Sequence, residues 1–375
     1  MELAGSKTIL VIRARAERIL GVSVENTFPV ASVILTTFNG GAYLRETLEA
    51  ILKQTFTDFE LIVIDDGSID DSVAIVKSYS DRRIRHFQNA QNLGISHTRN
   101  RGLELSRGEF IFAIDQDDIC LPTRLERQIA FMRANPGMVM VASSAKEWRN
   151  GKLRSFYKAE VRPHILHWRL FSRCGIVHSS VCMRASIIKD YKLSYEQIYH
   201  YAEDFVLFHK LAEHGQITIL ADELVIYREH DNNASARHNE EMEANGCRFL
   251  REQFYSYLGL EIDADAAELF WSAFVQGKPI HQAEKIRQVG EIYFKALQYF
   301  FKIKNFSVQQ KQEISDFAVA DWWSMVCRNV KATGRLSLLL EFEKVAKCKS
   351  HFLSWTDVVD CFLHSIFKYL KNTVV

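Results

Sequence analysis

The hydrophobic pattern between Val30 and about Asn233 alternates short β-branched runs with stretches of helical period. Five of the runs read as buried strands, at 32–36, 61–64, 110–114, 138–141 and 217–220. Hydrophobic residues spaced three and four apart predict helices at about 44–52, 95–105, 122–132 and 203–214. This alternation is typical of an α/β domain with a largely parallel sheet.

Residues 146–157 interrupt the alternation with mixed polar and aromatic positions, which fit either a pair of antiparallel strands or a flexible flap. After Ala234 the β-branched runs vanish. Helical periods then fill most of the chain, at 238–258, 281–303, 308–330, 334–347 and 352–371. We therefore expect three parts: an N-terminal extension at 1–27, an α/β domain at 28–235 and an all-α domain at 236–375.

Composition narrows the class of protein. Of 375 residues, 47% are hydrophobic and 25% are charged, which is ordinary for a folded globular chain. Lys and Arg (47) nearly cancel Asp and Glu (46), so no net field attracts nucleic acid, and nucleic acid is not an expected partner. The seven cysteines form no C-x-x-C pair and no regular spacing, which argues against a zinc site and a disulfide framework.

The same pattern bears on location. The segment up to Arg18 is rich in basic residues and lacks the hydrophobic stretch and cleavage site of a signal peptide. No run of about 18 apolar residues is free of charge, so we expect no membrane-spanning helix. A reducing, cytoplasmic location is the expectation, and contact with the membrane surface is left open.

Acidic residues cluster directly after two of the predicted strands. Asp65 and Asp66 follow the run at 61–64, and Asp115, Asp117 and Asp118 follow the run at 110–114. A single such aspartate often makes a turn or caps a helix. Several at the carboxyl edge of an open α/β sheet, where ligands bind, indicate a site. Because clustered carboxylates repel one another, a site that keeps them normally holds a cation, and Mg²⁺ or Mn²⁺ shared with substrate phosphates fits such ligands.

Two phosphate-binding motifs are absent from the sequence. It has no G-x-x-x-x-G-K-[ST], which excludes a P-loop NTPase, and no G-x-G-x-x-G after the first strand, which counts against a nicotinamide-dependent dehydrogenase. Arg99 follows Asn92-Leu93-Gly94 and has two interpretations. Its guanidinium would suit a diphosphate, or it would lie on a solvated helix face.

A set of motifs then follows in a fixed order. They are SVILTTFNGGAYLRETLEAILKQTFTDFELIVIDDGSIDDS at 32–72, QNLGISHTRNRGL at 91–103, GEFIFAIDQDDICLP at 108–122, YAEDFVLFHKLAEHG at 201–215 and YREH at 227–230. In order and spacing the chain resembles the family 2 glycosyltransferases, which are inverting enzymes with the GT-A fold. The resemblance implies that fold, a Rossmann-like and mostly parallel sheet, for the α/β domain.

The resemblance also implies roles on the side of the sugar donor. Thr36, Phe38 and Asn39 would line the nucleotide pocket, and Asp66 would accept a hydrogen bond from the base. Asp115 and Asp117 match the D-x-D element: Asp115 would lie near the ribose, and Asp117 would bind the metal through the sugar diphosphate. His230 ends the R-x-H element near the diphosphate and the metal, and Arg99 would contribute to nucleotide-sugar binding.

On the acceptor side, the resemblance implies that Asp204 is the catalytic base, with His178 and Glu203 nearby. An inverting transfer requires one base for the acceptor hydroxyl and charge relief for the leaving diphosphate. A structural alternative for Asp204 is the N-cap of its own helix, and the two roles are compatible.

The expected function is therefore an inverting glycosyltransferase that depends on Mn²⁺ or Mg²⁺. It would move a sugar from a nucleotide-diphosphate sugar, expected to be a UDP-sugar, to a hydroxyl of a saccharide or lipid-linked saccharide, in surface polysaccharide synthesis. Two alternatives stay open: a polyprenyl-phosphate glycosyltransferase, and a non-catalytic nucleotide-sugar-binding protein.

The end of the chain carries an amphipathic pattern. Aromatic and aliphatic residues recur every three or four positions over 352–371, with charged residues between them. This stripe either packs on the preceding helices or lies on a membrane surface near a lipid-linked acceptor. Four tryptophans are expected to be core anchors of the helical domain: Trp271, Trp322, Trp323 and Trp355.

Overall fold

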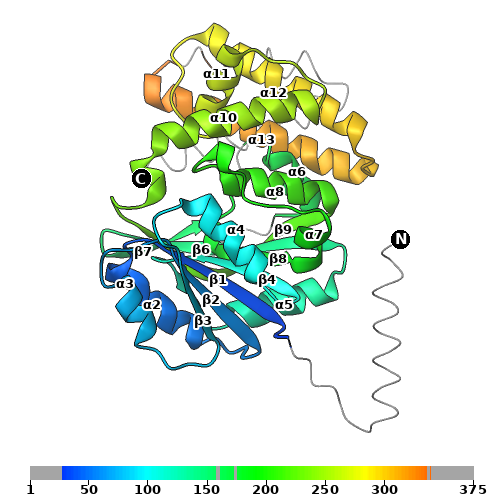
Figure 1. The fold of residues 1–375 in the computed structure, drawn as a ribbon. Coiled ribbons are helices and arrows are strands. Elements are labelled where there is room, and N and C mark those ends of the chain that lie inside the picture. Colours follow the sequence, from blue (N-terminus) through cyan, green and yellow to red (C-terminus); the bar gives the residue numbers. More distant parts are fainter. Residues whose placement is uncertain (1–27, 158–160, 173–174, 336–337, 339–375) are drawn as a thin grey trace, which may run out of the picture.

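The protein is described by a computed structural model that covers residues 28–157, 161–172, 175–335 and 338. Figure 1 shows an α/β region around one sheet and a helical region stacked on one side of it. Within these residues, no helix is both long enough and apolar enough to cross a membrane.

Among the described residues, nine strands form a single sheet. They are β1 Ala31–Thr37, β2 Phe59–Asp65, β3 Ile84–Gln88, β4 Phe110–Asp115, β5 Ile119–Cys120, β6 Met138–Arg149, β7 Lys152–Tyr157, β8 Cys182–Arg184 and β9 Gln216–Glu229. The order is β3-β2-β1-β4-β8-β6-β9-β5, and β7 pairs with β6. Strands β3, β2, β1 and β4 are parallel, as are β6 and β9, whereas β5, β7 and β8 run antiparallel to their neighbours. The mostly parallel sheet confirms the predicted fold class.

Seven helices and two 3₁₀ turns belong to the α/β region. They are α2 Gly41–Leu52, α3 Ser72–Lys77, α4 Ile95–Leu105, α5 Arg124–Ala134, α6 Pro163–Arg169, α7 Ala185–Asp190 and α8 Glu203–His214, with η1 His178–Ser180 and η2 Gln197–Tyr199. Helices α4 and α8 have the predicted bounds. The ambiguous residues 146–157 form the β6–β7 hairpin, so the antiparallel interpretation is confirmed.

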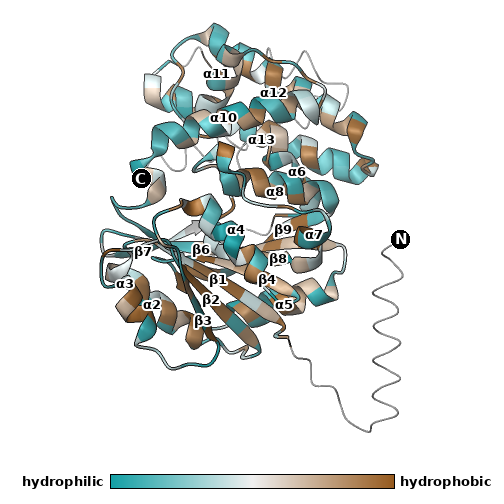
Figure 2. Ribbon diagram, in the orientation of Figure 1, coloured by the Kyte–Doolittle hydropathy of each residue, from teal (hydrophilic) through white to brown (hydrophobic). Residues whose placement is uncertain are grey.

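Alternate residues of β1 show why the sheet is hydrophobic on both faces. Val33 and Leu35 pack with α2 residues such as Leu44 in one buried cluster, whereas Ile34 joins Leu103 of α4 in another. Strands covered by helices on both faces read as unbroken apolar runs, because neither face meets water. In Figure 2 brown, hydrophobic residues run along these central strands.

The helical region contains α9 Ala234–Arg237, α10 Asn239–Ser256, α11 Ala264–Phe274, α12 Ala283–Ile303 and α13 Val308–Thr333. Three of these match the predicted helices at 238–258, 281–303 and 308–330, whereas α11 was not predicted. Helix α13 ends where Gly334 adopts a left-handed conformation (φ 70°), so no helix starts at residue 334. The rest of the helix predicted at 334–347, except residue 338, and all of 352–371 with Trp355 lie outside the described residues.

The helical region shares its core with the α/β region. Trp271, Trp322 and Trp323 are buried in it, as predicted. Trp168 of α6 and Phe205 of α8 belong to the same buried cluster. In Figure 1, α6 and α8 lie between the sheet and helices α10–α13. A domain boundary between residues 235 and 236 therefore stays a proposal, and it would cut through a continuous hydrophobic core.

Candidate active site

The sheet register brings the predicted acidic residues to one edge. Thr37 pairs with Asp65 across β1 and β2, and Thr36 pairs with Asp115 across β1 and β4. The three parallel strands therefore end side by side, and the loops that follow them meet there. This convergence was expected from the strand pattern; the role of each residue in it remains a prediction.

The loop after β1 is held by the middle residue of Asp115-Gln116-Asp117. Gln116 Oε1 accepts hydrogen bonds from Thr37 Oγ1 (2.7 Å) and from the Phe38 backbone N–H (2.9 Å). A Cβ on Gly40 would lie 2.2 Å from the same oxygen, so only glycine fits there. Gln116 was not among the predicted site residues. The variable position of a motif gave no signal, since its side chain serves the neighbouring loop.

Two predicted nucleotide-pocket residues lie on this loop. Phe38 is partly exposed, at 41%, so its ring is available to a ligand. Asn39 has a left-handed backbone (φ 50°), and its Oδ1 accepts a hydrogen bond from the Ile69 N–H at 3.0 Å. The Asn39 N–H in turn donates to Ser68 Oγ (2.9 Å), so the loops after β1 and β2 are joined.

Asp66 organises the loop that leads into α4. Its Oδ1 accepts from the N–H of Leu93 (3.0 Å) and from Asn89 Nδ2 (2.7 Å), and its Oδ2 accepts from the N–H of Gly94 (2.9 Å). The side chain is buried. Asp66 therefore fixes the loop that precedes α4, the helix that carries Arg99. A contact between Asp66 and a nucleotide base stays a prediction.

Arg99 lies at the centre of a buried ionic network. One guanidinium nitrogen donates to Asp115 Oδ1 and another to Glu203 Oε1, each at 2.7 Å. His178 Nδ1 lies 3.2 Å from Asp115 Oδ1, and His178 Nε2 lies 3.1 Å from the hydroxyl of Tyr195. The Arg99 side chain is only 7% exposed, so the solvated helix-face interpretation is wrong. We call Arg99, Asp115, His178 and Glu203 the Arg99 network.

The two acids of this network have opposite pKa shifts. Burial by itself would raise the pKa of Asp115, but the charges of Arg99 and His178 hold that pKa well below its usual range. Burial raises the pKa of Glu203, and the charge of Asp204 adds to the rise. Glu203 and His178 are both buried and turned toward Arg99 and Asp115. These contacts make them supports of the site, and contact with an acceptor remains a prediction for both.

A second group of polar residues lies just beyond Asp115, and its acids form no ion pair with Lys or Arg in the part of the chain that the structure describes. His230 Nε2 lies 3.1 Å from Asp117 Oδ2, and Asn233 Nδ2 donates to the same oxygen at 3.3 Å. Asp118 Oδ1 accepts from the Arg228 N–H at 2.9 Å, while its Oδ2 is buried without a hydrogen-bond partner. We call Asp117, Asp118, His230 and Asn233 the Asp117 cluster.

Electrostatics in the Asp117 cluster favour a cation. Burial raises the pKa of Asp117, and the negative charge of Asp115 raises it further. The pKa of Asp118 is raised well above its usual range by burial and by Asp117. No group of three or more His, Cys, Asp or Glu in the described part of the chain is arranged to hold a metal alone. Asp117 and His230 are the residues that could hold a Mn²⁺ or Mg²⁺ ion shared with substrate phosphates, and this metal site remains a prediction.

Helix α2 fixes the orientation of His230. The Tyr43 ring stacks on the imidazole, with centroids 4.7 Å apart and an angle of 17°. The Arg228 guanidinium lies 5.1 Å from the centroid of the same ring and forms an ion pair with Glu46. Tyr43 and Arg228 were not among the predicted site residues, because nothing in the sequence links α2 to the end of β9.

Asp204 lies in the first turn of α8. The N-cap of this helix is Ala202, so the N-cap interpretation of Asp204 is wrong. Its Oδ1 accepts from the Phe205 N–H (2.7 Å), and the side chain is partly exposed. The preceding residue, Glu203, is tied to Arg99. The start of α8, and Asp204 with it, is therefore anchored to the strand end that carries Asp115.

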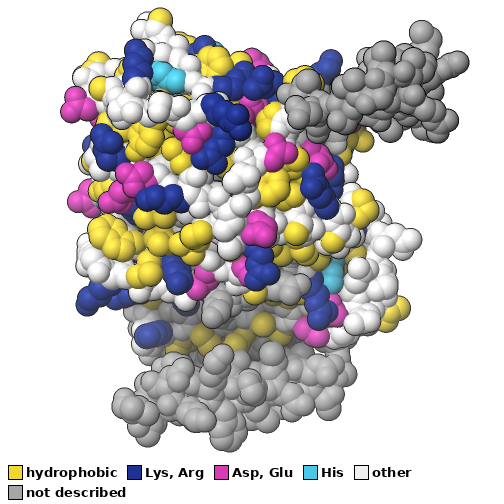
Figure 3. All heavy atoms as spheres, turned by 90° about the horizontal axis from the view of Figure 1, so that it is seen from below, with side chains coloured by type: hydrophobic (Ala, Val, Ile, Leu, Met, Phe, Trp, Pro, Cys, Tyr) yellow, Lys and Arg dark blue, Asp and Glu magenta, His cyan; other side chains and the backbone are white. Residues whose placement is uncertain are grey.

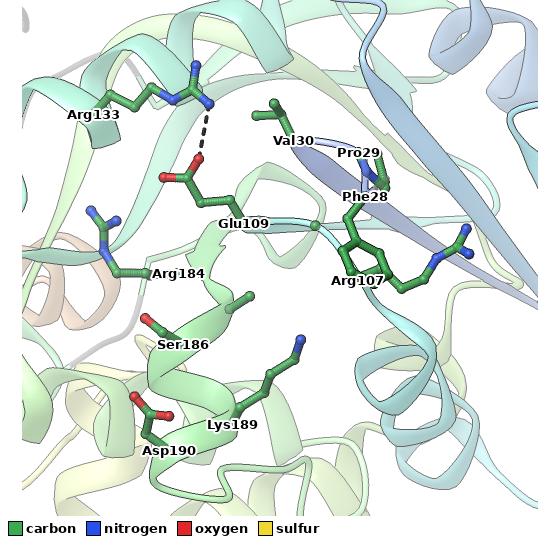
Figure 4. A pocket seen from close by; sticks show the side chains of 12 residues that line it. Phe28, Pro29, Val30, Arg107, Glu109, Arg133, Arg184, Ser186, Lys189 and Asp190 are labelled. Atoms are coloured by element: carbon green, nitrogen blue, oxygen red, sulfur yellow. Dashed lines mark hydrogen bonds and ion pairs between the residues drawn. The ribbon is translucent and has the colours of Figure 1, made fainter. Parts of the chain in front are cut away.

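A separate hollow of about 600 Å³ lies at the opposite edge of the sheet, where β1 and β4 begin. Figure 4 shows its basic side chains, with Arg133 paired to Glu109 at 3.0 Å. Arg107 pairs with Glu60, and Arg184 donates to backbone carbonyls. On the face seen in Figure 3, basic and acidic side chains are interspersed. The hollow is thus distinct from the acidic edge and offers no cluster of unpaired arginines.

Comparison with known proteins identifies the family. Residues 32–191 match the family model described as glycosyl transferase family 2. An uncharacterized glycosyltransferase of Methanocaldococcus jannaschii is 30% identical over 246 residues, which cover 62% of this chain and 79% of that relative. This chain is a family 2 glycosyltransferase. The predicted family and enzyme class are confirmed.

A named relative and a solved structure are also similar to this family 2 glycosyltransferase. An Escherichia coli relative, named UDP-Glc:alpha-D-GlcNAc-diphosphoundecaprenol beta-1,3-glucosyltransferase WfgD, is 26% identical over 51% of this chain and 73% of its own. The crystal structure of Staphylococcus aureus TarS residues 1–349 in complex with UDP-GlcNAc superposes with a TM-score of 0.54. That match covers 81% of this chain and 89% of the TarS 1–349 chain at 18% identity, so it shows a shared GT-A fold.

Proposed function

We propose that this glycosyltransferase catalyses an inverting, metal-dependent transfer from a UDP-sugar to a hydroxyl of a saccharide acceptor in polysaccharide synthesis. One observation carries the proposal. Asp115 is neutralised by Arg99, whereas Asp117, two residues further on, pairs with His230 and forms no ion pair with Lys or Arg among the described residues. A single cation site beside a nucleotide loop fits a nucleoside diphosphate as leaving group.

On the donor side, Thr36 at the end of β1 and Phe38 and Asn39 on the loop after it would enclose the base and ribose, together with Asp115. The Arg99 network keeps Asp115 ionised and fixed, so that its carboxylate can accept hydrogen bonds from sugar hydroxyls. Asp117 and His230 would hold the Mn²⁺ or Mg²⁺ ion, which when bound neutralises charge on the departing diphosphate.

On the acceptor side, Asp204 would take the proton of the attacking hydroxyl. Direct displacement at the anomeric carbon inverts its configuration and needs one base, with no covalent enzyme intermediate. The Asp204 carboxylate suits this role because it is partly exposed at the start of a helix whose first residue is tied to Arg99. Its neighbour Glu203 is buried and paired, so it leaves Asp204 as the accessible acid of the two.

The names of similar proteins support the choice of donor and acceptor. WfgD is named for UDP-Glc as donor and for a GlcNAc linked to diphosphoundecaprenol as acceptor. The TarS complex holds UDP-GlcNAc. By analogy, the donor of this chain would be a UDP-sugar and the acceptor a free or lipid-linked saccharide at the cytoplasmic side of a membrane.

A donor screen tests this proposal. Release of nucleotide is measured for UDP-, GDP- and dTDP-sugars, each with Mn²⁺, with Mg²⁺ and with EDTA. We expect metal-dependent turnover of a UDP-sugar, with inverted configuration of the product by NMR. Full activity in EDTA would contradict the assigned role of Asp117 and His230, and turnover of only GDP- or dTDP-sugars would contradict the assigned donor.

A second candidate acceptor is a polyprenyl phosphate, which would share the whole donor side. The WfgD name favours an acceptor in which a saccharide is already linked to the lipid. Offering undecaprenyl phosphate and a saccharide-diphosphate lipid in parallel separates the two. Transfer to the saccharide lipid alone is the expected result.

A further inference from the structure

The segment just before Asp204 is held by the helical region. Asn245 Nδ2 of α10 donates to the His200 carbonyl at 3.0 Å, and Arg248 of α10 donates to the Ile198 carbonyl. The Tyr199 hydroxyl donates to Glu252, also on α10. The first long helix after the α/β region therefore fixes the chain that leads into the proposed base.

Tyr201 lies in this segment in an unusual conformation. Its φ is 62°, in the left-handed region that is a genuine outlier for a bulky residue. Its ring stacks on the imidazole of His238, with centroids 4.1 Å apart and an angle of 5°. Strained backbone of this kind costs of order 1–3 kcal/mol and concentrates at functional sites. The strain places the tyrosine ring against the junction of α9 and α10.

The stacked pair is accessible, and Tyr201 comes two residues before the first residue of α8. His238 is exposed and Tyr201 is partly exposed. The pKa of Tyr201 is raised by burial and then by the charges of Glu241 and Glu203, so the hydroxyl lies within electrostatic reach of the start of α8. A flat aromatic surface with polar atoms at its edges suits a pyranose ring, whose C–H face is apolar and whose rim carries hydroxyls.

We propose that Tyr201 and His238 form the platform on which the acceptor saccharide lies, so that the acceptor subsite is built jointly by the α/β region and the helical region. The inference rests on the proposed function through Asp204 as the base. Tyr201 is three residues before Asp204, and His238 comes from a different region, so the pair would set the distance between the acceptor hydroxyl and the carboxylate.

The chain offers a matched control at the other end of α8. Tyr191 stacks on His214 with centroids 3.7 Å apart and an angle of 19°, and Tyr191 is 53% exposed. His214 is the last residue of α8 and Glu203 the first, so this pair lies roughly 16 Å along the helix from the acids. It has the same chemistry and similar exposure without the proximity to Asp204.

Three variants separate the platform from the fold. Tyr201→Gly removes the ring and accepts the left-handed backbone, so it relieves the strain instead of adding to it. Tyr201→Phe keeps the stack. Tyr191→Ala removes the control ring. Thermal melts of all three should stay close to the wild type, and calorimetry should give an unchanged affinity for UDP with Mn²⁺.

Saturation-transfer NMR reads out the platform directly. The probes are methyl β-glucoside, methyl β-galactoside and methyl N-acetyl-β-glucosaminide, each added to protein saturated with UDP and Mn²⁺. We expect contacts between at least one probe and the wild type, an affinity about tenfold weaker in Tyr201→Gly, a smaller loss in Tyr201→Phe, which keeps the ring but not the hydroxyl, and wild-type affinity in Tyr191→Ala.

Three results would overturn the inference: no probe contacting the wild type, equal affinity in wild type and Tyr201→Gly, or an equal loss in Tyr191→Ala. Failure of the proposed function is recognised separately, because it removes nucleotide-sugar turnover from the wild type in the donor screen. Turnover in that screen combined with any of the three results would refute the platform alone.

Discussion

Two groups of acids at the end of β4 handle their charge in opposite ways. In the Arg99 network, the guanidinium pairs with Asp115 and Glu203 at 2.7 Å each, and His178 adds a third contact. In the Asp117 cluster, His230 is the one ion-pair partner of Asp117 within the described part of the chain, and one oxygen of Asp118 has no hydrogen-bond partner there. Asp115 of the first group and Asp117 of the second are only two residues apart.

The difference shows what each group is suited to do. A buried ion pair with full hydrogen bonding fixes its members in place, and removing one partner leaves an uncompensated charge. Acids that lack such a partner repel each other and become strong ligands once a cation arrives. The Arg99 network therefore suits positioning, and the Asp117 cluster suits binding of a cation together with an anionic substrate.

The largest effect is expected from Asp117→Asn, which tests the cation-binding half of the comparison. Loss of this carboxylate should reduce nucleotide release by about 10⁴-fold, because the leaving diphosphate would lose charge neutralisation worth several kcal/mol. Steady-state release of UDP measures it, and thermal melts serve as a folding control. Turnover within tenfold of the wild type would show that the cluster does not serve the leaving group.

Asp204→Asn should follow with a loss of transfer of about 10³-fold, the usual worth of a general base. Donor affinity should stay unchanged, because the Arg99 network that anchors α8 remains intact. Comparing transfer rates with calorimetric UDP-sugar binding separates the two effects. A variant with near-normal transfer would remove Asp204 from the mechanism and leave the acids of the network as candidates.

Arg99→Met breaks the paired half of the comparison. Asp115 and Glu203 would be left without their cation, and we expect the free energy of unfolding to fall by about 3 kcal/mol in denaturant melts. Adding Glu203→Gln should recover part of that loss, because it removes one uncompensated charge. The exposed pair Arg127–Asp222 is the control: Arg127→Met should change stability by less than about 1 kcal/mol. Equal effects at the two arginines would contradict a structural role of the network.

A smaller effect is expected at His209. This side chain is buried in its neutral form, whereas Arg99 is buried as part of ion pairs. His209 Nε2 lies 3.0 Å from the Leu170 carbonyl among aromatic rings, and burial lowers its pKa from 6.5 to about 3. Between pH 3 and pH 6.5 this histidine is protonated in the unfolded chain but neutral in the folded chain. Stability is therefore lost as pH falls from about 6.5 toward 3, by about 1.4 kcal/mol per pH unit for this group.

Denaturant melts from pH 7 to pH 4.5 measure this effect. His209→Gln should show a shallower loss of stability on acidification than the wild type, since it removes one proton-binding difference. Identical pH slopes in the two proteins would mean that His209 is not held neutral by the fold.

The sequence alone determined the frame of the protein. The bounds of α4 and α8 and the positions of the acids after β2 and β4 follow from hydrophobic period and turn residues, which reflect interactions within a few positions along the chain. Several elements were not predicted from the sequence. They span few residues or lie between weak boundaries, so their patterns repeat too few times to stand out. They are β3, β8, α3, α6, α7 and α11. The order of the motifs also predicted the family, and the comparisons with known proteins confirmed it.

Only the tertiary structure decided how the acids are used. Arg99 and Glu203 are 104 positions apart, and the Asp117–His230 contact joins residues 113 positions apart. No local pattern encodes such pairs. Whether an arginine is solvated or buried, and whether a carboxylate meets a cation or another acid, depends on packing that brings distant segments within hydrogen-bond distance. Burial then strengthens every charge–charge interaction there, so the same residue types became a rigid support on one side and a cation-seeking site on the other.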